Sequence, residues 1–211
     1  MVGQSVLREC LLDPDVKKVL CVGRNATGQT AGKLRDLVLP DLFQLGPVES
    51  ELTGFDACFY CLGVTSAGMS EAAYRRITYD LTLSVAQTLA RLNTAMTFLF
   101  VSGTGADSTE NSRTMWARVK GATENALFRM PFQAAYAIRP AVILPEHGIR
   151  SRTRMYQAFY TLGRPLFPVL RLVVPHYVTT TTALGRAMIR MAREGAPKPV
   201  IESWDIAGLA G

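Results

Sequence analysis

Short apolar runs that end in glycine alternate with segments of helical periodicity along most of this chain. Three such runs are Lys18–Gly23 (KVLCVG), Phe55–Gly63 (FDACFYCLG) and Met96–Gly105 (MTFLFVSGTG). Between the second and the third, Glu71–Leu92 repeats apolar residues every four positions, as an amphipathic helix does. Strands that are apolar throughout are typical of a parallel sheet covered by helices on both faces. The sequence therefore predicts a doubly wound α/β sheet.

The remaining pattern completes the alternation and predicts how the chain is divided. We expect residues 1–145 to form the core of the sheet. Residues 146–211 are expected to form a small lobe that selects the substrate and whose last strand returns to the sheet. Further helices are expected at residues 2–12, 114–128 and 183–194, and further strands at residues 133–144, interrupted by Pro140, and 198–206.

Charge is distributed unevenly along the 211 residues, whose formal net charge is +6. Nine arginine and lysine residues after Gly148 face only Glu194, Glu202 and Asp205. This excess indicates either a solvated basic face or a site for an anionic ligand or an acidic surface. Nucleic acid is not favoured, because the arginines alternate with apolar residues and no known binding module is present. The apolar run Leu166–Pro175 is too short and too interrupted to span a bilayer.

The four cysteines lie within apolar runs, and the chain does not start with a signal peptide. These features predict a reduced, cytoplasmic setting. Cys58 and Cys61 have the spacing of a redox motif, but they lie in an expected strand, so their thiols should point to opposite faces. This geometry argues against a redox role and against a metal site.

In a sheet of this kind, ligands bind at the carboxyl ends of the strands, so the residues that follow the strands are the first candidates. Arg24 follows the first run and stands about 20 residues after Gly3, where a dinucleotide fold contacts the adenosine ribose. Its forked cation suits a 2′-phosphate and hence NADP, although an ordinary surface arginine is the alternative. Gly63, between Leu62 and Val64, would let the backbone approach the cofactor closely, or simply ends the strand.

Several segments together resemble a known superfamily. The chain resembles atypical, extended short-chain dehydrogenase/reductases of the NAD-dependent epimerase/dehydratase kind, and especially the small branch of Tat-interacting oxidoreductase-like proteins. The resemblance implies a Rossmann-like fold, an NADP(H) or NAD cofactor and a small carbonyl or alcohol substrate; we expect a monomer or a homodimer. The matching segments are VLCVGR, DACFYCLG, FLFVSGTGAD, RVKGATEN, YAIRPAVIL and TTALGRAM.

The resemblance assigns catalytic roles to three positions. Thr104 matches the Ser/Thr that hydrogen-bonds the substrate oxygen, and Lys120 matches the lysine that holds the nicotinamide ribose. Trp116 occupies the position four residues before the lysine, where the family has its acid/base tyrosine. An indole N–H cannot be deprotonated at useful pH. Either reductase chemistry is lost, or another group, such as Tyr79, supplies the proton.

Other matching positions carry less defined expectations. Thr78 lies near the place where extended members have a helix asparagine that steadies a water chain. Arg139 and Pro140 match the segment that crosses beneath the nicotinamide, although Arg139 could equally be structural. His147 and His176 have no acidic partner in the sequence pattern and are interpreted as loop or packing residues.

The family begins with a strand followed by G-x-x-G-x-x-G, whereas here only Met-Val-Gly precedes the first helix, so Gly3 would be the third glycine. Omitting this central strand leaves buried backbone groups unpaired, at about 1–3 kcal/mol each. Three explanations are open. The true start lies upstream of Met1; the sheet closes up, with the Val19 strand beside the Cys58 strand; or another segment, from this chain or a partner, fills the position.

Taken together, the residues predict an NADP-preferring oxidoreductase or epimerase-like protein whose catalysis is weakened or lost. The first alternative is a non-catalytic nucleotide-binding protein that acts through partners, which Trp116 favours. The second alternative is a purely structural subunit whose basic carboxyl-terminal part makes the contact.

Overall fold

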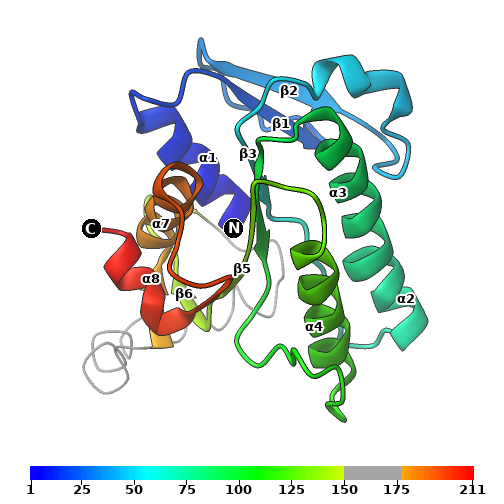
Figure 1. Ribbon diagram of the computed structural model, residues 1–211. Coiled ribbons are helices and arrows are strands. Elements are labelled where there is room, and N and C mark those ends of the chain that lie inside the picture. The colour runs from blue at the N-terminus through cyan, green and yellow to red at the C-terminus, as the bar shows by residue number, and fades with distance from the viewer. Residues whose placement is uncertain (150–176) are drawn as a thin grey trace.

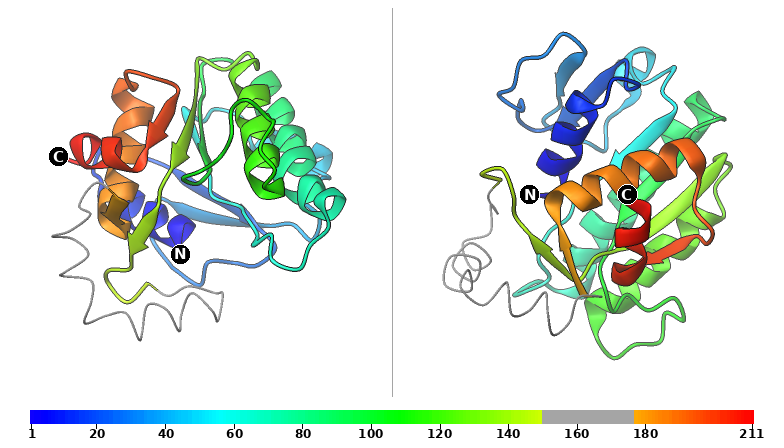
Figure 2. Two further views of the ribbon diagram at one scale, coloured as in Figure 1. Left: turned by 90° about the horizontal axis from the view of Figure 1, so that it is seen from below. Right: turned by 90° about the vertical axis from the view of Figure 1, so that its left-hand side faces the viewer.

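The computed structural model describes residues 1–149 and 177–211 as a layered α/β fold. Parallel strands form the middle layer, and helices cover both of its faces (Figures 1 and 2). This arrangement confirms the predicted doubly wound sheet. One face carries α1 (Val2–Leu12), α7 (Thr181–Glu194) and α8 (Ser203–Leu209), and the other carries α2 (Glu71–Arg75), α3 (Leu81–Leu92) and α4 (Met115–Phe128).

The main sheet has four parallel strands, and their order in space is β3–β4–β5–β8. The last of them, β8, brings the carboxyl-terminal part of the chain back to the sheet, where Ile201 pairs with Ile138 of β5. The four strands are β3 (Ala57–Tyr60), β4 (Thr97–Val101), β5 (Ala134–Arg139) and β8 (Val200–Glu202).

Two further parallel pairs of strands stand apart from the main sheet. They are β1 (Val19–Gly23) with β2 (Leu34–Val38), and β6 (Val142–Leu144) with β7 (Val178–Thr180). Among the described residues, β1 pairs with β2 alone, and β3 pairs with β4 alone. The explanation in which the sheet closes up, with the Val19 strand directly beside the Cys58 strand, is therefore wrong.

Each face of the sheet has its own hydrophobic core. The α1/α7 core gathers buried residues of α1, α7 and α8 against the sheet, with Leu99 and Ile201 at its centre. The α3/α4 core lies on the opposite face and includes Phe98, Phe100 and Leu127. Neighbouring residues of β4 thus point into different cores, as the period of two in a strand requires.

Helices α1 and α7 cross at very close range, although they are far apart in the sequence. Gly185 makes this possible, because a Cβ at that position would lie 2.7 Å from Cγ of Glu9 and 3.3 Å from the carbonyl oxygen of Ser5. The Ser5 hydroxyl donates a hydrogen bond to the carbonyl oxygen of Thr181 at the start of α7. This crossing joins the amino-terminal residues to the carboxyl-terminal part of the fold.

Two expected elements differ in detail from the structure. The single helix expected at residues 71–92 contains a π-helical segment, η2 (Arg76–Asp80), between α2 and α3, and such insertions arise where an i→i+4 ladder is interrupted. The strand expected at residues 198–206 ends at Glu202, where α8 begins. A capping box turns the chain there: Glu202 accepts from the backbone of Asp205, and Asp205 accepts from the backbone N–H of Glu202.

Candidate functional site

The end of β4 and the start of α4 bring together the three residues to which the sequence assigned chemistry. Beyond β4, the chain continues alongside the end of β5: the N–H of Ser102 donates to the carbonyl of Ile138 at 2.8 Å, and the N–H of Thr104 donates to that of Pro140 at 3.2 Å. The Thr104 hydroxyl donates to the carbonyl of Arg139 at 2.8 Å. Thr104 is thereby held at the carboxyl edge of the sheet, beside Pro140.

Trp116 and Lys120 stand one turn apart on α4. The indole lies against Gly105, whose φ is +91° and where an added Cβ would be 3.2 Å from Cη2 of Trp116. The Lys120 ammonium lies 5.3 Å from the centre of the Phe100 ring. Thr104, Trp116 and Lys120 are therefore grouped around the carboxyl end of β4.

Lys120 is partly buried, and the structure describes no carboxylate within ion-pair distance of it in residues 1–149 and 177–211. Burial lowers the pKa of its ammonium to about 8, and the neighbouring Glu124 carboxylate only partly opposes this shift. A cation without an ion-pair partner at this edge of the sheet is available to an anionic or polar ligand. Near pH 8 it also exchanges its proton readily.

A buried charge network lies behind this group, and the sequence pattern did not indicate it. Glu124, one turn after Lys120 on α4, is fully buried. It accepts from Nε of Arg139 at 3.1 Å and also from the Ser102 hydroxyl. Arg139 further donates to Glu202 at 3.0 Å and to the Ser108 hydroxyl at 2.6 Å.

This network ties β4, β5, β8 and α4 together at the carboxyl edge. The Arg139 guanidinium, for which the sequence left a cofactor contact and a structural role open, is engaged by two carboxylates. The one available signal was the spacing of Lys120 and Glu124, which share a helix face. Nothing in the linear pattern connects Glu124 with an arginine that follows the helix.

The cofactor residues predicted at the other strand ends lie apart from this group. Arg24 is exposed just after β1 and has no ion pair in the described part of the chain. Gly63 and Val64 are exposed after β3, and Leu62 packs against the α3/α4 core. Gly3 lies in the first turn of α1, where an added Cβ would be 3.4 Å from Cβ of Cys61. Gly3 is thus next to the end of β3.

The two candidates on the long helix are held by other contacts. Tyr79 lies in η2 with its ring 4.0 Å from the Arg75 guanidinium. Thr78 is buried, and its carbonyl accepts from the hydroxyl of Thr82 at 2.7 Å and from that of Thr123 at 3.4 Å. No described contact joins Tyr79 to Thr104 or Lys120. His147 is exposed in a loop, and His176 lies outside the described residues.

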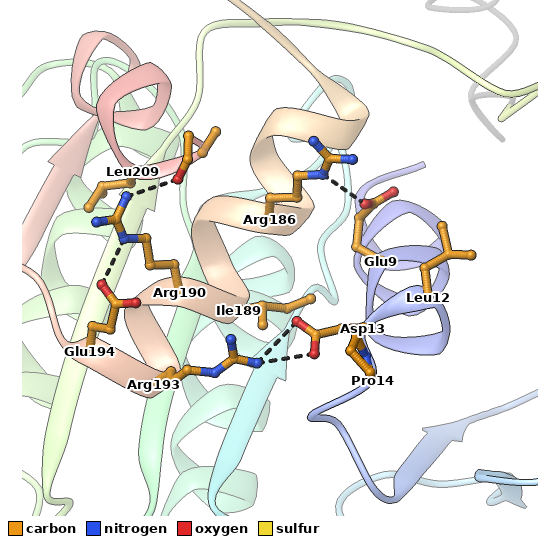
Figure 3. Close-up of a pocket in the computed structure, with 12 residues that line it drawn as sticks. Glu9, Leu12, Asp13, Pro14, Arg186, Ile189, Arg190, Arg193, Glu194 and Leu209 are labelled. Carbon is orange, nitrogen blue, oxygen red and sulfur yellow. Dashed lines mark hydrogen bonds and ion pairs between the residues drawn. The ribbon is translucent and has the colours of Figure 1, made fainter.

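A groove lies elsewhere, at the opposite edge of the sheet. It encloses about 550 Å³ between the carboxyl-terminal ends of α1, α7 and α8. Figure 3 shows that its arginines are paired: Arg186 with Glu9, Arg193 with Asp13, and Arg190 with Glu194. Helices run antiparallel to the strands here, so this groove flanks the amino ends of the strands, away from the edge where such sheets bind ligands.

These pairings change the interpretation of the basic carboxyl-terminal sequence. In the described residues, Lys198 likewise pairs with Asp205 at 2.7 Å, and Arg193 reaches Asp15 at 3.4 Å. Acids in and just after the amino-terminal helix, remote in sequence, thus pair with Arg186 and Arg193 of α7. The basic residues between 150 and 176 lie outside the described residues.

Cys58 and Cys61 lie on opposite faces of the sheet, as predicted: Cys58 packs against the α3/α4 core and Cys61 against the α1/α7 core. Burial raises the pKa of both thiols to about 12. Within residues 1–149 and 177–211, no three His, Cys, Asp or Glu side chains are grouped as a metal ion requires. In the same residues, no helix has the length and apolar character needed to cross a membrane.

Solved structures with a similar fold include a short-chain dehydrogenase/reductase, an epimerase and an enzyme solved in complex with NAD⁺. The Bordetella bronchiseptica enzyme WbmF in complex with NAD⁺ matches 99% of this chain and 73% of its own, with a TM-score of 0.66 and 15% identity. A short-chain dehydrogenase/reductase from Saccharomyces cerevisiae matches 99% of this chain and 94% of its own, with a TM-score of 0.62 and 13% identity. A UDP-galactose 4-epimerase has a TM-score of 0.64 and 14% identity, and the match covers 96% of this chain and 72% of the epimerase chain. The fold is therefore that of Rossmann-type dehydrogenases and epimerases.

Sequence comparison finds curated relatives of a different description. Protein FMP52-1, mitochondrial, from Scheffersomyces stipitis is 26% identical over 172 residues, which cover 79% of this chain and 75% of the relative. Protein fmp52, mitochondrial, from Emericella nidulans is 27% identical over 165 residues, which cover 75% of this chain and 68% of the relative. No family model matches the sequence. The expectation of a cytoplasmic setting is contradicted, because these relatives are named as mitochondrial proteins.

Proposed function

We propose that this protein binds NADP(H) at the carboxyl edge of its sheet and is an oxidoreductase of the dehydrogenase/epimerase kind with weakened catalysis. The observation that carries the proposal is the grouping of Thr104, Trp116 and Lys120 at the end of β4. The fold shared with WbmF, which was solved with NAD⁺, supports the choice of a nicotinamide cofactor.

The residues present fit the two ends of such a cofactor. At one end, Lys120 is a cation without an ion-pair partner among the described residues, which suits the hydroxyls of the nicotinamide ribose. At the other, Arg24 is exposed after β1, which suits a 2′-phosphate. Gly3, at the start of α1, is next to the end of β3 and would face the diphosphate with backbone N–H groups. Leu62, Gly63, Val64 and Pro140 would border the cofactor between these ends.

The nicotinamide ring, when bound, supplies or accepts a hydride. Thr104 would position the substrate oxygen, and its hydroxyl proton is already donated to the carbonyl of Arg139. A hydroxyl has one proton and two lone pairs, so in this state Thr104 accepts from an alcohol more readily than it donates to a carbonyl. Trp116 neither gives nor takes a proton. The chain thus lacks the usual acid/base at that position, which explains the weakened catalysis.

Trp116 also supports a second function, a non-catalytic protein that binds the nucleotide and acts through partners. The indole covers Gly105 and occupies the position of the acid/base while leaving Lys120 in place. Binding would then survive without turnover. Residues 150–176 of the small lobe predicted to select the substrate lie outside the described residues. Under either function we therefore name the substrate only as a carbonyl compound or an alcohol.

One titration tests the proposal. Fluorescence of NADPH and of NADH is followed as the full chain is added, and turnover is then measured across a panel of ketones and secondary alcohols. Binding with slow turnover supports the oxidoreductase, and binding without turnover supports the regulatory protein. If neither cofactor binds, both proposed functions are contradicted.

The pH dependence of binding is expected to follow Lys120. Below its pKa of about 8 the ammonium donates hydrogen bonds, and above it the neutral amine binds more weakly. We expect NADPH affinity to fall about tenfold as the pH rises through the range of roughly 7 to 9.5. The Lys120→Arg variant stays charged, so its affinity for NADPH should not decline with pH. The Lys120→Met variant should bind NADPH weakly at every pH. If the unsubstituted protein binds NADPH with constant affinity over this pH range, the assignment of Lys120 to the cofactor site is contradicted.

Arg24 is expected to set the preference between the two cofactors. Arg24→Ala should weaken the binding of NADPH about 10- to 100-fold, which is the effect of losing a charge-assisted hydrogen bond, and should leave the binding of NADH unchanged. Arg35→Ala is the matched control, because Arg35 is exposed on β2 and pairs with Glu51. Equal losses for both cofactors would show that Arg24 does not contact the 2′-phosphate.

The curated relatives also support a location. We propose that the protein resides in mitochondria, since its FMP52 relatives are named as mitochondrial. Immunoblotting of purified mitochondria against the cytosolic fraction tests this, and recovery in the cytosolic fraction alone contradicts it.

A further inference from the structure

Lys120 keeps an unpaired ammonium although a carboxylate stands one helical turn away. Glu124 follows it on the same face of α4, at the four-residue spacing at which a lysine and a glutamate attract each other. The ammonium instead lies 5.3 Å from the centre of the Phe100 ring on β4, and no carboxylate in the described part of the chain is within ion-pair distance of it. The Glu124 carboxylate is therefore held away from Lys120.

Both oxygens of the Glu124 carboxylate are occupied from the side of the sheet. Oε1 accepts from Nε of Arg139 at 3.1 Å and from the Ser102 hydroxyl, and Oε2 accepts from Nη2 of Arg139. Such two-point contacts between a guanidinium and a carboxylate are strong and directional, so they fix the orientation of the carboxylate. Glu124 is fully buried, so its charge needs a partner, and Arg139 is that partner.

Arg139 is itself held from two further directions. Its Nη1 donates to Glu202 at the end of β8 at 3.0 Å, and its Nη2 donates to the Ser108 hydroxyl at 2.6 Å. Because Arg139 is buried, water competes little for these contacts. With Lys120 protonated, the two carboxylates and the two cations of this cluster balance one another.

We propose that Arg139 is a positioning residue that acts through Glu124: by occupying the Glu124 carboxylate, it leaves the Lys120 ammonium free to bind the cofactor. Without the guanidinium, Glu124 would turn to the cation on its own helix face. The new ion pair would compete with the cofactor for the N–H groups of Lys120. The inference deepens the proposed function and rests on it for the role of Lys120. It gives Arg139 an effect on binding without a contact to the cofactor.

Other charges on the elements packed against α4 do not offer Lys120 a buried partner. Tyr74 of α2 is buried, and burial raises the pKa of its hydroxyl, so it stays neutral. Burial lowers the pKa of Lys120, and Glu124 is the described charge that opposes this effect. The titration of Lys120 therefore reports on the position of Glu124. The remaining charges on α2 and η2 are exposed: Glu71, which pairs with Arg118, and Arg75, Arg76 and Asp80.

An NMR titration of the protein labelled with ¹³C-lysine tests the inference without any cofactor, and the Lys120→Arg variant assigns the signal. We expect the pKa of Lys120 to rise from about 8 in the unsubstituted protein to about 9 or higher in Arg139→Met, because an ion pair favours the charged amine. Arg139→Gln, a polar replacement that also removes the charge, should show the same rise.

Two further proteins complete this titration. The double variant Glu124→Leu with Arg139→Met has no carboxylate at this position, so the pKa of Lys120 should return to about 8 or below. Arg118→Met is the matched control, because Arg118 lies on α4 but pairs with Glu71 of α2 at 2.7 Å. It should leave the pKa of Lys120 unchanged.

Cofactor affinity at neutral pH gives the second measurement. Arg139→Met should weaken the binding of NADPH about tenfold, the effect of losing a charge-assisted hydrogen bond. Adding Glu124→Leu should restore the binding, because the competing carboxylate is then gone. A role of Arg139 in structure alone would not produce this recovery. Far-UV circular dichroism establishes that each variant is folded before it is titrated.

Two results would overturn the inference. The first is a pKa of Lys120 that stays near 8 or falls in both Arg139 variants, which means that Glu124 does not turn to Lys120. The second is a double variant that binds NADPH as weakly as Arg139→Met, which means that Arg139 acts by another route. If the unsubstituted protein binds neither cofactor, the proposed function fails, and the NMR titration still decides whether Arg139 keeps Lys120 unpaired.

Discussion

Replacing Gly121 with alanine is expected to destabilise the fold by about 3 kcal/mol or more, a large effect for one methyl group. An ideal Cβ at Gly121 would lie 1.7 Å from the carbonyl oxygen of Asp107 and 3.1 Å from the nitrogen of Ser108. Both are backbone atoms, so no side chain can rotate to relieve the clash. The loop must move away from α4 or the helix must shift.

The loop cannot move freely, because several contacts hold it on α4. The N–H of Asp107 donates to the carbonyl of Ala117 at 3.0 Å, and the side chain of Asn125 donates to the carbonyl of Ser108 at 2.9 Å. The Asp107 carboxylate accepts from the backbone of Thr109 and Ser112, which closes the loop on itself. Displacing this unit would break contacts on both sides of Lys120.

Chemical denaturation of Gly121→Ala and of Gly208→Ala measures the effect. Gly208 lies in α8, where an added Cβ meets no atom within 4 Å. Alanine there should stabilise by about 0.5–1 kcal/mol through helix propensity alone. A Gly121→Ala protein that also gains stability would show that the loop does not rest on the helix as described.

Sequence periodicity predicted the architecture because the signals that specify it are local. Apolar runs such as those ending at Gly23 and Gly63 predicted strands, the rule that ligands bind at strand ends singled out Arg24 and Gly63, and the family resemblance singled out Thr104 and Lys120. The strand-end rule applies because the strands are connected in parallel through helices, and the short loops between strand and helix largely determine these connections.

The contacts that escaped prediction join residues that are distant in the sequence. The arginines of α7 resembled a basic face, but Glu9 of α1 and Asp13, just after that helix, neutralise Arg186 and Arg193. Likewise, the close approach of Asp107 to Gly121 is a contact between two backbones, and such contacts leave no periodic signal. Charge counting along the chain cannot detect a partner that only folding brings near.

Replacing Glu124 with alanine is expected to cost about 3–5 kcal/mol of stability, the range for removing one partner of a buried ion pair. Glu124 is fully buried, and Arg139 is 8% exposed. Without Glu124, the guanidinium keeps only Glu202 as an anionic partner, and the Ser102 hydroxyl loses its acceptor. The cost arises mainly from the charge left buried, and less from the lost attraction.

Urea denaturation at neutral pH measures this cost against Glu194→Ala. Glu194 pairs with Arg190 at 2.8 Å on the exposed face of α7. Exposed pairs of this kind contribute about 0–1 kcal/mol, so the control should lose little. A Glu124→Ala protein that loses no more than the control would show that the network is solvated.

The double variant Glu124→Leu with Arg139→Met distinguishes the charge penalty from a packing defect. If the loss in Glu124→Ala comes from an uncompensated charge, removing both charges while keeping volume should restore most of the stability. If the loss comes from a cavity, Glu124→Leu alone should already restore most of the stability, because it fills the volume while the Arg139 charge stays in place. Recovery of stability, together with unchanged NADPH affinity, would also show that Arg139 supports the strand ends without contacting the cofactor. A double variant that is stable but binds NADPH about tenfold more weakly or worse would return Arg139 to the cofactor site for which the sequence nominated it.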